Sequence, residues 1–194
     1  MSEEHRFNKE IIEQPERIIA TLRHNDPAVR RIAHEYAGKI SEIMLIGCGD
    51  PYMHSFAGAY AFTQWAKTPA YAMEAADYAM YRAHLASERT LLVLISQSGK
   101  TVKVIDSATI AKKGGAKMIA VTNSVPSPVT EFTSDILQTQ AGVSRAYPTK
   151  TTTTGLAVVL ALALAWAEEK KSLPDEEIAK LRNELNEKIP AAIK

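Results

Sequence analysis

Five short apolar segments, each followed by a stretch of helical character, alternate along most of this 194-residue sequence. Continuous apolar segments fit strands that are buried on both faces, and the helical stretches between them provide the cover. The pattern therefore predicts an α/β fold, a three-layer αβα sandwich built around a parallel sheet. We expect the strands at 42–47, 70–75, 90–96, 117–122 and 135–140.

The spacing of these strands favours the doubly wound, flavodoxin-like order 2-1-3-4-5. In this order the switch point lies between the first and third strands, and ligands bind at the carboxyl ends of the strands there. Two loops are therefore expected to form the ligand site. They are "GCGDP" after the first strand and "SQSGKT" after the third.

Helical segments flank the predicted sheet on both sides. In the N-terminal segment, Pro15 predicts either a break in the helix or the first turn of a new one. Asp26 with Pro27 predicts the start of a further helix. A charged helix is expected after Pro174. These features divide the chain into an N-terminal helical arm at 1–40, a central domain at 41–170 and a C-terminal helix at 171–194.

The composition excludes several classes of protein. The 23 basic and 22 acidic side chains nearly cancel, so no net field attracts nucleic acid or anionic lipid. The longest apolar run, at 155–167, is shorter than the roughly 20 residues of a membrane span, and we expect it in the core or at a subunit interface. The single Cys48 and an N-terminus without an apolar core predict a cytoplasmic protein without nucleic-acid or membrane partners.

The stretch "LLVLISQSGKT" at 91–101 has the Gly-Lys-Thr ending of a nucleotide phosphate loop. That motif requires a first glycine five positions before Gly99, and the residue there is Leu94, inside the predicted strand. The loop is too short to wrap a chain of phosphates, so the sequence argues against an NTPase.

The same loop nevertheless has the chemistry of a phosphate site. Ser96, Ser98 and Thr101 offer hydroxyl groups, Gln97 offers an amide, and Gly99 allows close approach of the backbone. The helix that follows directs free N–H groups and its positive dipole end toward the same position. These neutral donors suit a phosphate monoester, and we expect no metal ion and no cofactor. The alternative is that the hydroxyl groups only cap the helix.

At these residues the chain resembles the SIS (sugar isomerase) family of phosphosugar-binding domains. The loop is similar to the family's "ISQSGET", "GCGD" to its "CGTS", and "TK" at 149–150 to its "STKAYT". The arm "KEIIEQPERIIATL" resembles the segment that opens the isomerase portion of glucosamine-6-phosphate synthase and of fructosamine-6-phosphate deglycases. The resemblance implies a substrate site formed by Gly47, Cys48, Gly49, Asp50, Ser96, Gln97, Ser98, Gly99, Thr101 and Lys150.

The sequence departs from the family pattern at several positions. Asp50 and Pro51 replace Thr-Ser, so Asp50 either hydrogen-bonds the sugar or serves as a plain helix cap. Lys100 replaces the usual acidic residue and either adds charge complementarity to a phosphate or points to solvent, and we favour solvent. Lys150 is retained, either as a ligand or as a residue that starts a helix.

Isomerisation of a sugar phosphate needs a base that moves a proton between adjacent carbons. The candidates are Glu74 at the end of the second strand, Asp77 shortly after it, His54 one turn into the helix after the first strand, and His84, although each is also explained as structural. Of these, we favour Glu74 and His54. Cys48 fits a small buried hydrophobe better than a nucleophile.

We therefore expect a phosphosugar isomerase or deglycase that works as a homo-oligomer or with a second SIS domain. The resemblance implies that family members of this type carry two such domains in tandem. The alternatives are a non-catalytic phosphosugar-binding module and the N-terminal half of a double-SIS enzyme.

Overall fold

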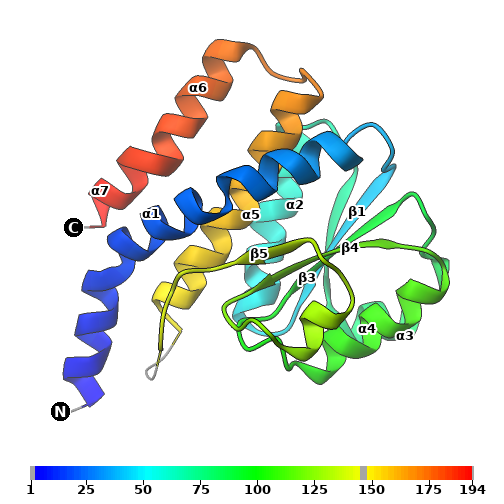
Figure 1. The fold of residues 1–194 in the computed structure, drawn as a ribbon, viewed down its shortest axis with the longest axis horizontal. Helices are drawn as coiled ribbons and strands as arrows, with labels where there is room; N and C mark the ends of the chain where they lie inside the picture. Colours follow the sequence, from blue (N-terminus) through cyan, green and yellow to red (C-terminus); the bar gives the residue numbers. More distant parts are fainter. Residues whose placement is uncertain (1–2, 145–147, 194) are drawn as a thin grey trace.

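The computed structural model describes residues 3–144 and 148–193, and it has a five-stranded parallel sheet in the order β2-β1-β3-β4-β5 (Figure 1). The predicted strand order is confirmed, and the observed strands lie within the expected segments. The shortest strand is the last, where the apolar pattern is weakest. The strands are β1 (Glu42–Gly47), β2 (Ala70–Glu74), β3 (Thr90–Ile95), β4 (Lys117–Thr122) and β5 (Ile136–Gln138).

Helices cover both faces of the sheet, which confirms the three-layer architecture. The helices are α1 (Glu3–Tyr36), α2 (Asp50–Gln64), α3 (Ala75–Tyr81), α4 (Val102–Lys113), α5 (Lys150–Glu169), α6 (Asp175–Asn183) and α7 (Ile189–Ala192). Short helical turns are η1 (Ala83–Leu85), η2 (Pro128–Glu131) and the π-helical η3 (Glu184–Lys188). Because side chains alternate along a strand, Ile43 and Leu45 pack under α1, α2 and α5, whereas Met44 and Ile46 pack under α3 and α4.

The first helix corrects the expectation for the N-terminal arm. α1 is continuous over 34 residues and contains both Pro15 and Pro27, so the predicted break and the predicted second helix start are wrong. Pro15 has no N–H to donate to the carbonyl of Ile11, and the Gln14 side-chain amide donates to that carbonyl instead, at 3.3 Å. Packing supplies the rest of the stability, because one face of α1 lies in the core with Ile18 and Ile32 fully buried.

The apolar run at 155–167 forms the centre of α5, which lies against α1 and α2 (Figure 1). Val158, Leu162 and Trp166 are fully buried, and the ring of Trp166 meets Phe62 edge-to-face at 5.7 Å. Among the described residues, α5 is the one helix long and apolar enough to cross a membrane. Most of it is buried inside the protein, as expected of a core helix.

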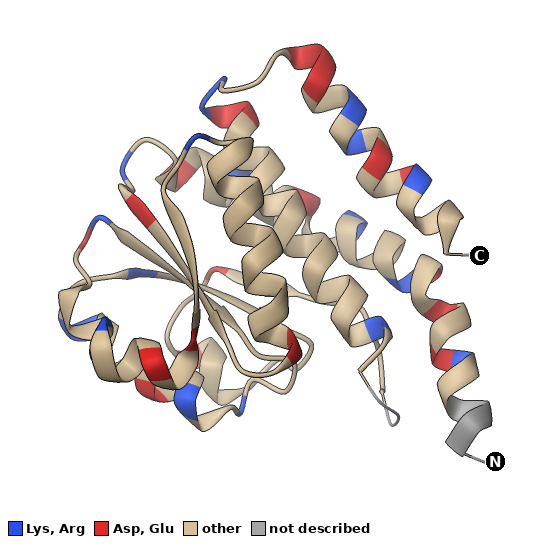
Figure 2. Cartoon of the chain, turned by 180° about the vertical axis from the view of Figure 1, so that it is seen from behind, with Lys and Arg blue, Asp and Glu red and all other residues tan. Residues whose placement is uncertain are grey.

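The C-terminal segment folds back over α1 and α5. Ile178 of α6 and Leu185 of η3 are buried in the same core as Ile18 of α1. Acidic and basic residues intermingle along α6 and α1 on the outside (Figure 2). The division into arm, domain and C-terminal helix stays a prediction, although all three segments share one hydrophobic core.

Candidate functional site

The two predicted loops lie side by side at the carboxyl edge of the sheet. β1 pairs with β3 from Glu42↔Thr90 to Ile46↔Leu94, so the loop after Gly47 and the loop after Ile95 leave the sheet next to each other. β4 pairs with β3 on the other side, which brings Thr122 and Asn123 to the same edge. The topology therefore assembles polar groups from three strands at the switch point.

Loop 96–101 presents its hydroxyl groups without using them to cap α4. The Oγ of Ser96 and the Oγ1 of Thr101 are 2.7 Å apart, and the Oγ of Ser98 accepts a hydrogen bond from the backbone N–H of Lys100 at 3.2 Å. Thr101 is the residue before the first helical residue of α4, and its side chain makes no capping bond. The first turn of α4 therefore lacks a side-chain cap, although the N–H of Val104 already donates to the carbonyl of Thr101 at 3.0 Å. An anion could bind to the N–H groups before Val104.

The shape of this loop depends on Gly99. Its φ of +66° lies in the left-handed region, and a Cβ atom there would lie 2.0 Å from the Oγ of Ser127. The backbone N–H of Val129 donates to the carbonyl of Gly99 at 3.0 Å, which ties the loop to η2. Lys100 is exposed, as expected for a side chain that points to solvent.

In the loop after β1, Gly47 is buried and Gly49 is exposed. Gly49 is the N-cap residue of α2, and Asp50 is the first helical residue. The interpretation of Asp50 as the N-cap residue is therefore wrong, because Gly49 occupies that position. Its carboxylate is 3.5 Å from the hydroxyl of Thr152 on α5.

Cys48 and Glu74 face each other across the β1–β2 edge. Burial and a hydrogen bond to Glu74 raise the pKa of the Cys48 thiol to about 11, which keeps it protonated and supports its interpretation as a small hydrophobe. Burial opposes ionisation of Glu74, but hydrogen bonds from Cys48 and from backbone N–H groups outweigh burial and lower its pKa. The Glu74 carboxylate accepts from the N–H of Ala76 at 2.6 Å and caps α3.

His54, the second candidate base, lies on α2 and is only 5% exposed. Within the described residues, neither ring nitrogen has a hydrogen-bond partner. Burial lowers the pKa of the imidazole, and the nearby charge of Asp50 opposes this shift only in part. Burial thus favours the neutral form of the His54 ring.

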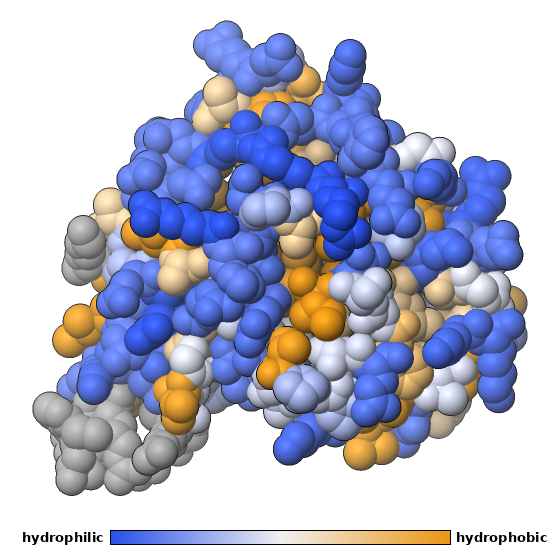
Figure 3. Space-filling view, viewed as in Figure 1, coloured by the Kyte–Doolittle hydropathy of each residue, from blue (hydrophilic) through white to orange (hydrophobic). Residues whose placement is uncertain are grey.

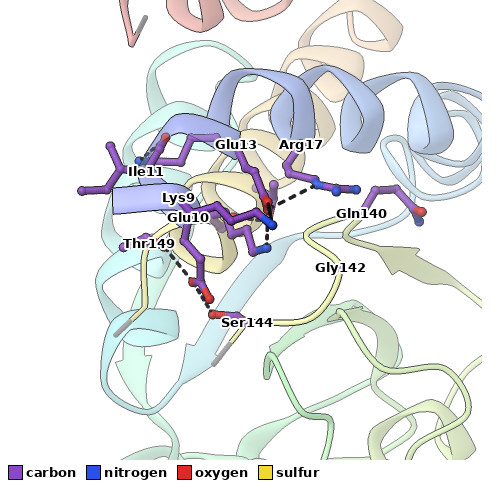
Figure 4. A network of polar contacts seen from close by, with 12 residues as sticks. Lys9, Glu10, Ile11, Glu13, Arg17, Gln140, Gly142, Ser144 and Thr149 are labelled. Atoms are coloured by element: carbon purple, nitrogen blue, oxygen red, sulfur yellow. Dashed lines mark hydrogen bonds and ion pairs between the residues drawn. The ribbon is translucent and has the colours of Figure 1, made fainter. Parts of the chain in front are cut away.

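Lys150, predicted as a ligand, is buried at 4% exposure and engaged by α1. Its Nζ lies 2.6 Å from a carboxylate oxygen of Glu13, and this hydrogen bond is the main reason that the pKa of Glu13 is lowered. Glu10, one turn earlier, accepts from the hydroxyls of Ser144 and Thr149 at 2.7 and 3.1 Å (Figure 4). This network attaches α1 to the start of α5, and a ligand role for Lys150 stays a prediction.

A small cavity lies beside loop 96–101 and is one feature that the sequence did not reveal. Its wall combines Gln97 of the loop with residues from five other segments, so no local motif could have indicated it. The lining residues are Pro51, His54, Ile95, Gln97, Val121, Thr122, Asn123, Thr139, Thr151 and Gly155. No group of three or more potential metal-ligating His, Cys, Asp or Glu side chains occurs within 3–144 and 148–193.

Known proteins share the sequence pattern of this chain. A profile of the SIS domain family matches residues 39–165. Relatives from Clostridium acetobutylicum and Thermococcus kodakarensis, both named glutamine–fructose-6-phosphate aminotransferase (isomerizing), are 34% and 33% identical over 190 residues. The matches cover 94% and 97% of this chain but 31% of each relative, so the chain spans about a third of their length.

The fold is shared as well. The solved C-terminal domain of glucosamine-fructose-6-phosphate aminotransferase from Francisella tularensis superposes with a TM-score of 0.85 and is 30% identical. The match covers 96% of this chain and 54% of the solved chain, so nearly half of the solved chain lies outside the match.

Proposed function

Because the chain belongs to the SIS domain family, we propose that it binds a phosphorylated sugar with the phosphate on loop 96–101. The observation that carries this proposal is the set of hydroxyls on Ser96, Ser98 and Thr101 at the start of α4, where none of them caps the helix. Uncapped N–H groups and hydroxyl donors together suit a phosphate monoester. The sugar then extends toward Gly49 and Asp50, in the loop after β1.

We further propose that the chain contributes to isomerisation or deglycation of an amino-sugar or ketose phosphate. The named relatives support this reaction class, since they are isomerizing aminotransferases of fructose 6-phosphate by name. Proton transfer between adjacent carbons needs a base with access to the substrate. Glu74 is poorly suited because its carboxylate already caps α3 and its pKa is lowered. A base from a second SIS domain, in the same chain or another copy, would complete the site.

One face of the molecule supports such a pairing. Met53, Phe56 and Tyr60 recur at helical spacing on α2 and are 58%, 39% and 69% exposed. By contrast, hydrophilic residues dominate the face formed by α1 and α6 (Figure 3). α2 begins at Asp50, so a domain packed on its outer face would reach the loop after β1. We propose that a second SIS domain packs there.

The second candidate function is a phosphosugar-binding module without chemistry. The engagement of Glu74 as a cap favours it, because one of the two favoured candidate bases is then used structurally. Turnover of a bound sugar phosphate separates the two functions.

The test is to incubate the protein with fructose 6-phosphate, glucosamine 6-phosphate and a fructosamine 6-phosphate, following thermal stability and product formation. We expect stabilisation by at least one of these, and its loss in a Ser98→Ala, Thr101→Ala double variant. Thr109→Ala, on the exposed side of the same helix α4, is the matched control and should keep the stabilisation. Stabilisation without turnover would favour the binding module. No stabilisation by any sugar phosphate would overturn the proposal.

A further inference from the structure

His54 is a buried polar side chain that the fold leaves without a partner. It is 5% exposed, and neither Nδ1 nor Nε2 has a hydrogen-bond partner in the part of the chain that the structure describes. Native proteins pair the large majority of buried side-chain polar atoms, and exceptions call for a specific explanation. An unpartnered imidazole therefore points to a group that arrives with a ligand or with water.

The ring is held in place by close packing against α5. A Cβ atom added at Gly155 would lie 3.0 Å from Nδ1 and 3.1 Å from Cε1 of His54. Any side chain at position 155 would therefore press on the imidazole. The absence of a side chain at Gly155 leaves space for the His54 ring. Packing this close fixes the ring where it lines the cavity.

The cavity beside the ring is small, and a few polar side chains interrupt its mainly apolar lining. Its volume is about 20 Å³, which admits one water-sized group and excludes a sugar ring. Gln97 of the phosphate loop and Thr151 of α5 belong to the same wall. A neutral imidazole offers one donor and one acceptor, so it can exchange hydrogen bonds with a single hydroxyl or carbonyl oxygen.

We propose that His54 forms the inner end of the sugar subsite and hydrogen-bonds one hydroxyl or carbonyl oxygen of the sugar whose phosphate lies on loop 96–101. This inference rests on the proposed function and deepens it. Gln97 joins the two parts, because it belongs to the phosphate loop and also lines the cavity. His54 would thus help to distinguish a sugar phosphate from a phosphate that carries no sugar.

The experiment measures dissociation constants for fructose 6-phosphate and for inorganic phosphate, in the unmodified protein and in His54→Leu. Loss of one hydrogen bond should weaken fructose 6-phosphate binding about five- to tenfold and leave inorganic phosphate binding unchanged. His24→Leu, at an exposed histidine of α1, is the matched control and should change neither constant. A sugar preference that His54→Leu leaves intact would overturn the inference, while the proposed function would stand.

A second measurement avoids substitution altogether. The ¹⁵N chemical shifts of the His54 ring, recorded in the unmodified protein, should move on addition of fructose 6-phosphate and not on addition of inorganic phosphate. This result decides the matter if His54→Leu does not fold. Ring shifts that stay constant while fructose 6-phosphate binds would mean that His54 is satisfied by buried water, contrary to the inference. A protein that binds no sugar phosphate would refute the proposed function and the inference together.

Discussion

Lys150 is the first residue of α5, and His54 lies on α2 and packs against the same end of α5. The two side chains are buried to the same degree, yet their surroundings are opposite. Lys150 is 4% exposed and its ammonium contacts the Glu13 carboxylate at 2.6 Å. His54, packed against Gly155 one turn further along α5, is 5% exposed and has no hydrogen-bond partner among the described residues. The Lys150–Glu13 pair joins α5 to α1 and so stabilises the fold. The His54 ring has two unpaired nitrogen atoms and lines a cavity.

The difference shows how a charged group and a titratable neutral group respond to burial. A buried ammonium needs a counter-ion, so a ligand role for Lys150 would require it to leave Glu13. A buried imidazole becomes neutral instead and tolerates burial next to a small cavity. Burial alone therefore does not identify a ligand-binding residue, whereas burial without a partner does suggest one.

The largest effect on stability is expected when the ion pair between Lys150 and Glu13 is broken. Glu13→Ala should lower the free energy of unfolding by about 2 to 4 kcal/mol, because it leaves the Lys150 ammonium buried without its partner. This loss is near the lower end of the range expected when a buried ion pair is broken, because the Glu13 side chain is 21% exposed. Chemical denaturation measures the change.

Two further variants test the cause of that loss. Glu16→Ala, at an exposed glutamate on the same helix, should change stability by no more than about 0.5 kcal/mol. Adding Lys150→Met to Glu13→Ala should restore part of the loss, because the unpaired charge is removed. Equal destabilisation by Glu13→Ala and Glu16→Ala would show that the pair is not what stabilises this region.

A smaller effect on stability is expected around His54, whose ring nitrogens have no hydrogen-bond partner among the described residues. Gly155→Ala should destabilise the protein by about 1 to 2 kcal/mol, since the new methyl group presses on the His54 ring and this outweighs the gain in helix propensity. Gly38→Ala is the control, because a Cβ atom at Gly38 meets nothing within 4 Å. Thermal denaturation compares the two variants, and a more stable Gly155→Ala protein would contradict the packing described for His54.

The smallest effect appears only as the pH changes. The folded-state pKa is lowered for both His54 and Glu13, so each group contributes stability above its unfolded pKa and loses it as the pH falls toward its folded pKa. The loss begins near pH ~6.5 for His54 and near pH ~4.3 for Glu13, at no more than about 1.4 kcal/mol per pH unit for each proton.

Urea denaturation between about pH 7.5 and about pH 3 provides the measurement, because the Glu13 window lies below its unfolded pKa. His54→Leu should lack the loss in the upper window and keep the loss in the lower one. Glu13→Ala should behave in the opposite way. Identical pH profiles for His54→Leu and the unmodified protein would argue against a buried neutral imidazole.

The inner strands β1, β3 and β4 were predictable because they are buried almost throughout and so appear as continuous apolar segments. The strand order then placed the loops after β1 and β3 together, which is why Gly49, Asp50 and Ser96 could be proposed from sequence. α1 was not predictable by the same local rules. Pro15 indicated a break, but Gln14 satisfies the freed carbonyl of Ile11, and packing on α5 stabilises the whole helix.

The sequence by itself determined the layers of this protein, the strand order and the loop that carries Ser96, Ser98 and Thr101. These features depend on local patterns and on the general handedness of parallel connections. Only the tertiary structure decided which buried polar groups are satisfied. Lys150 meets Glu13 across 137 positions of sequence, and the cavity beside His54 exists only where α2, α5 and the sheet edge come together. Pairing between residues so far apart depends on packing in space, which no local pattern encodes.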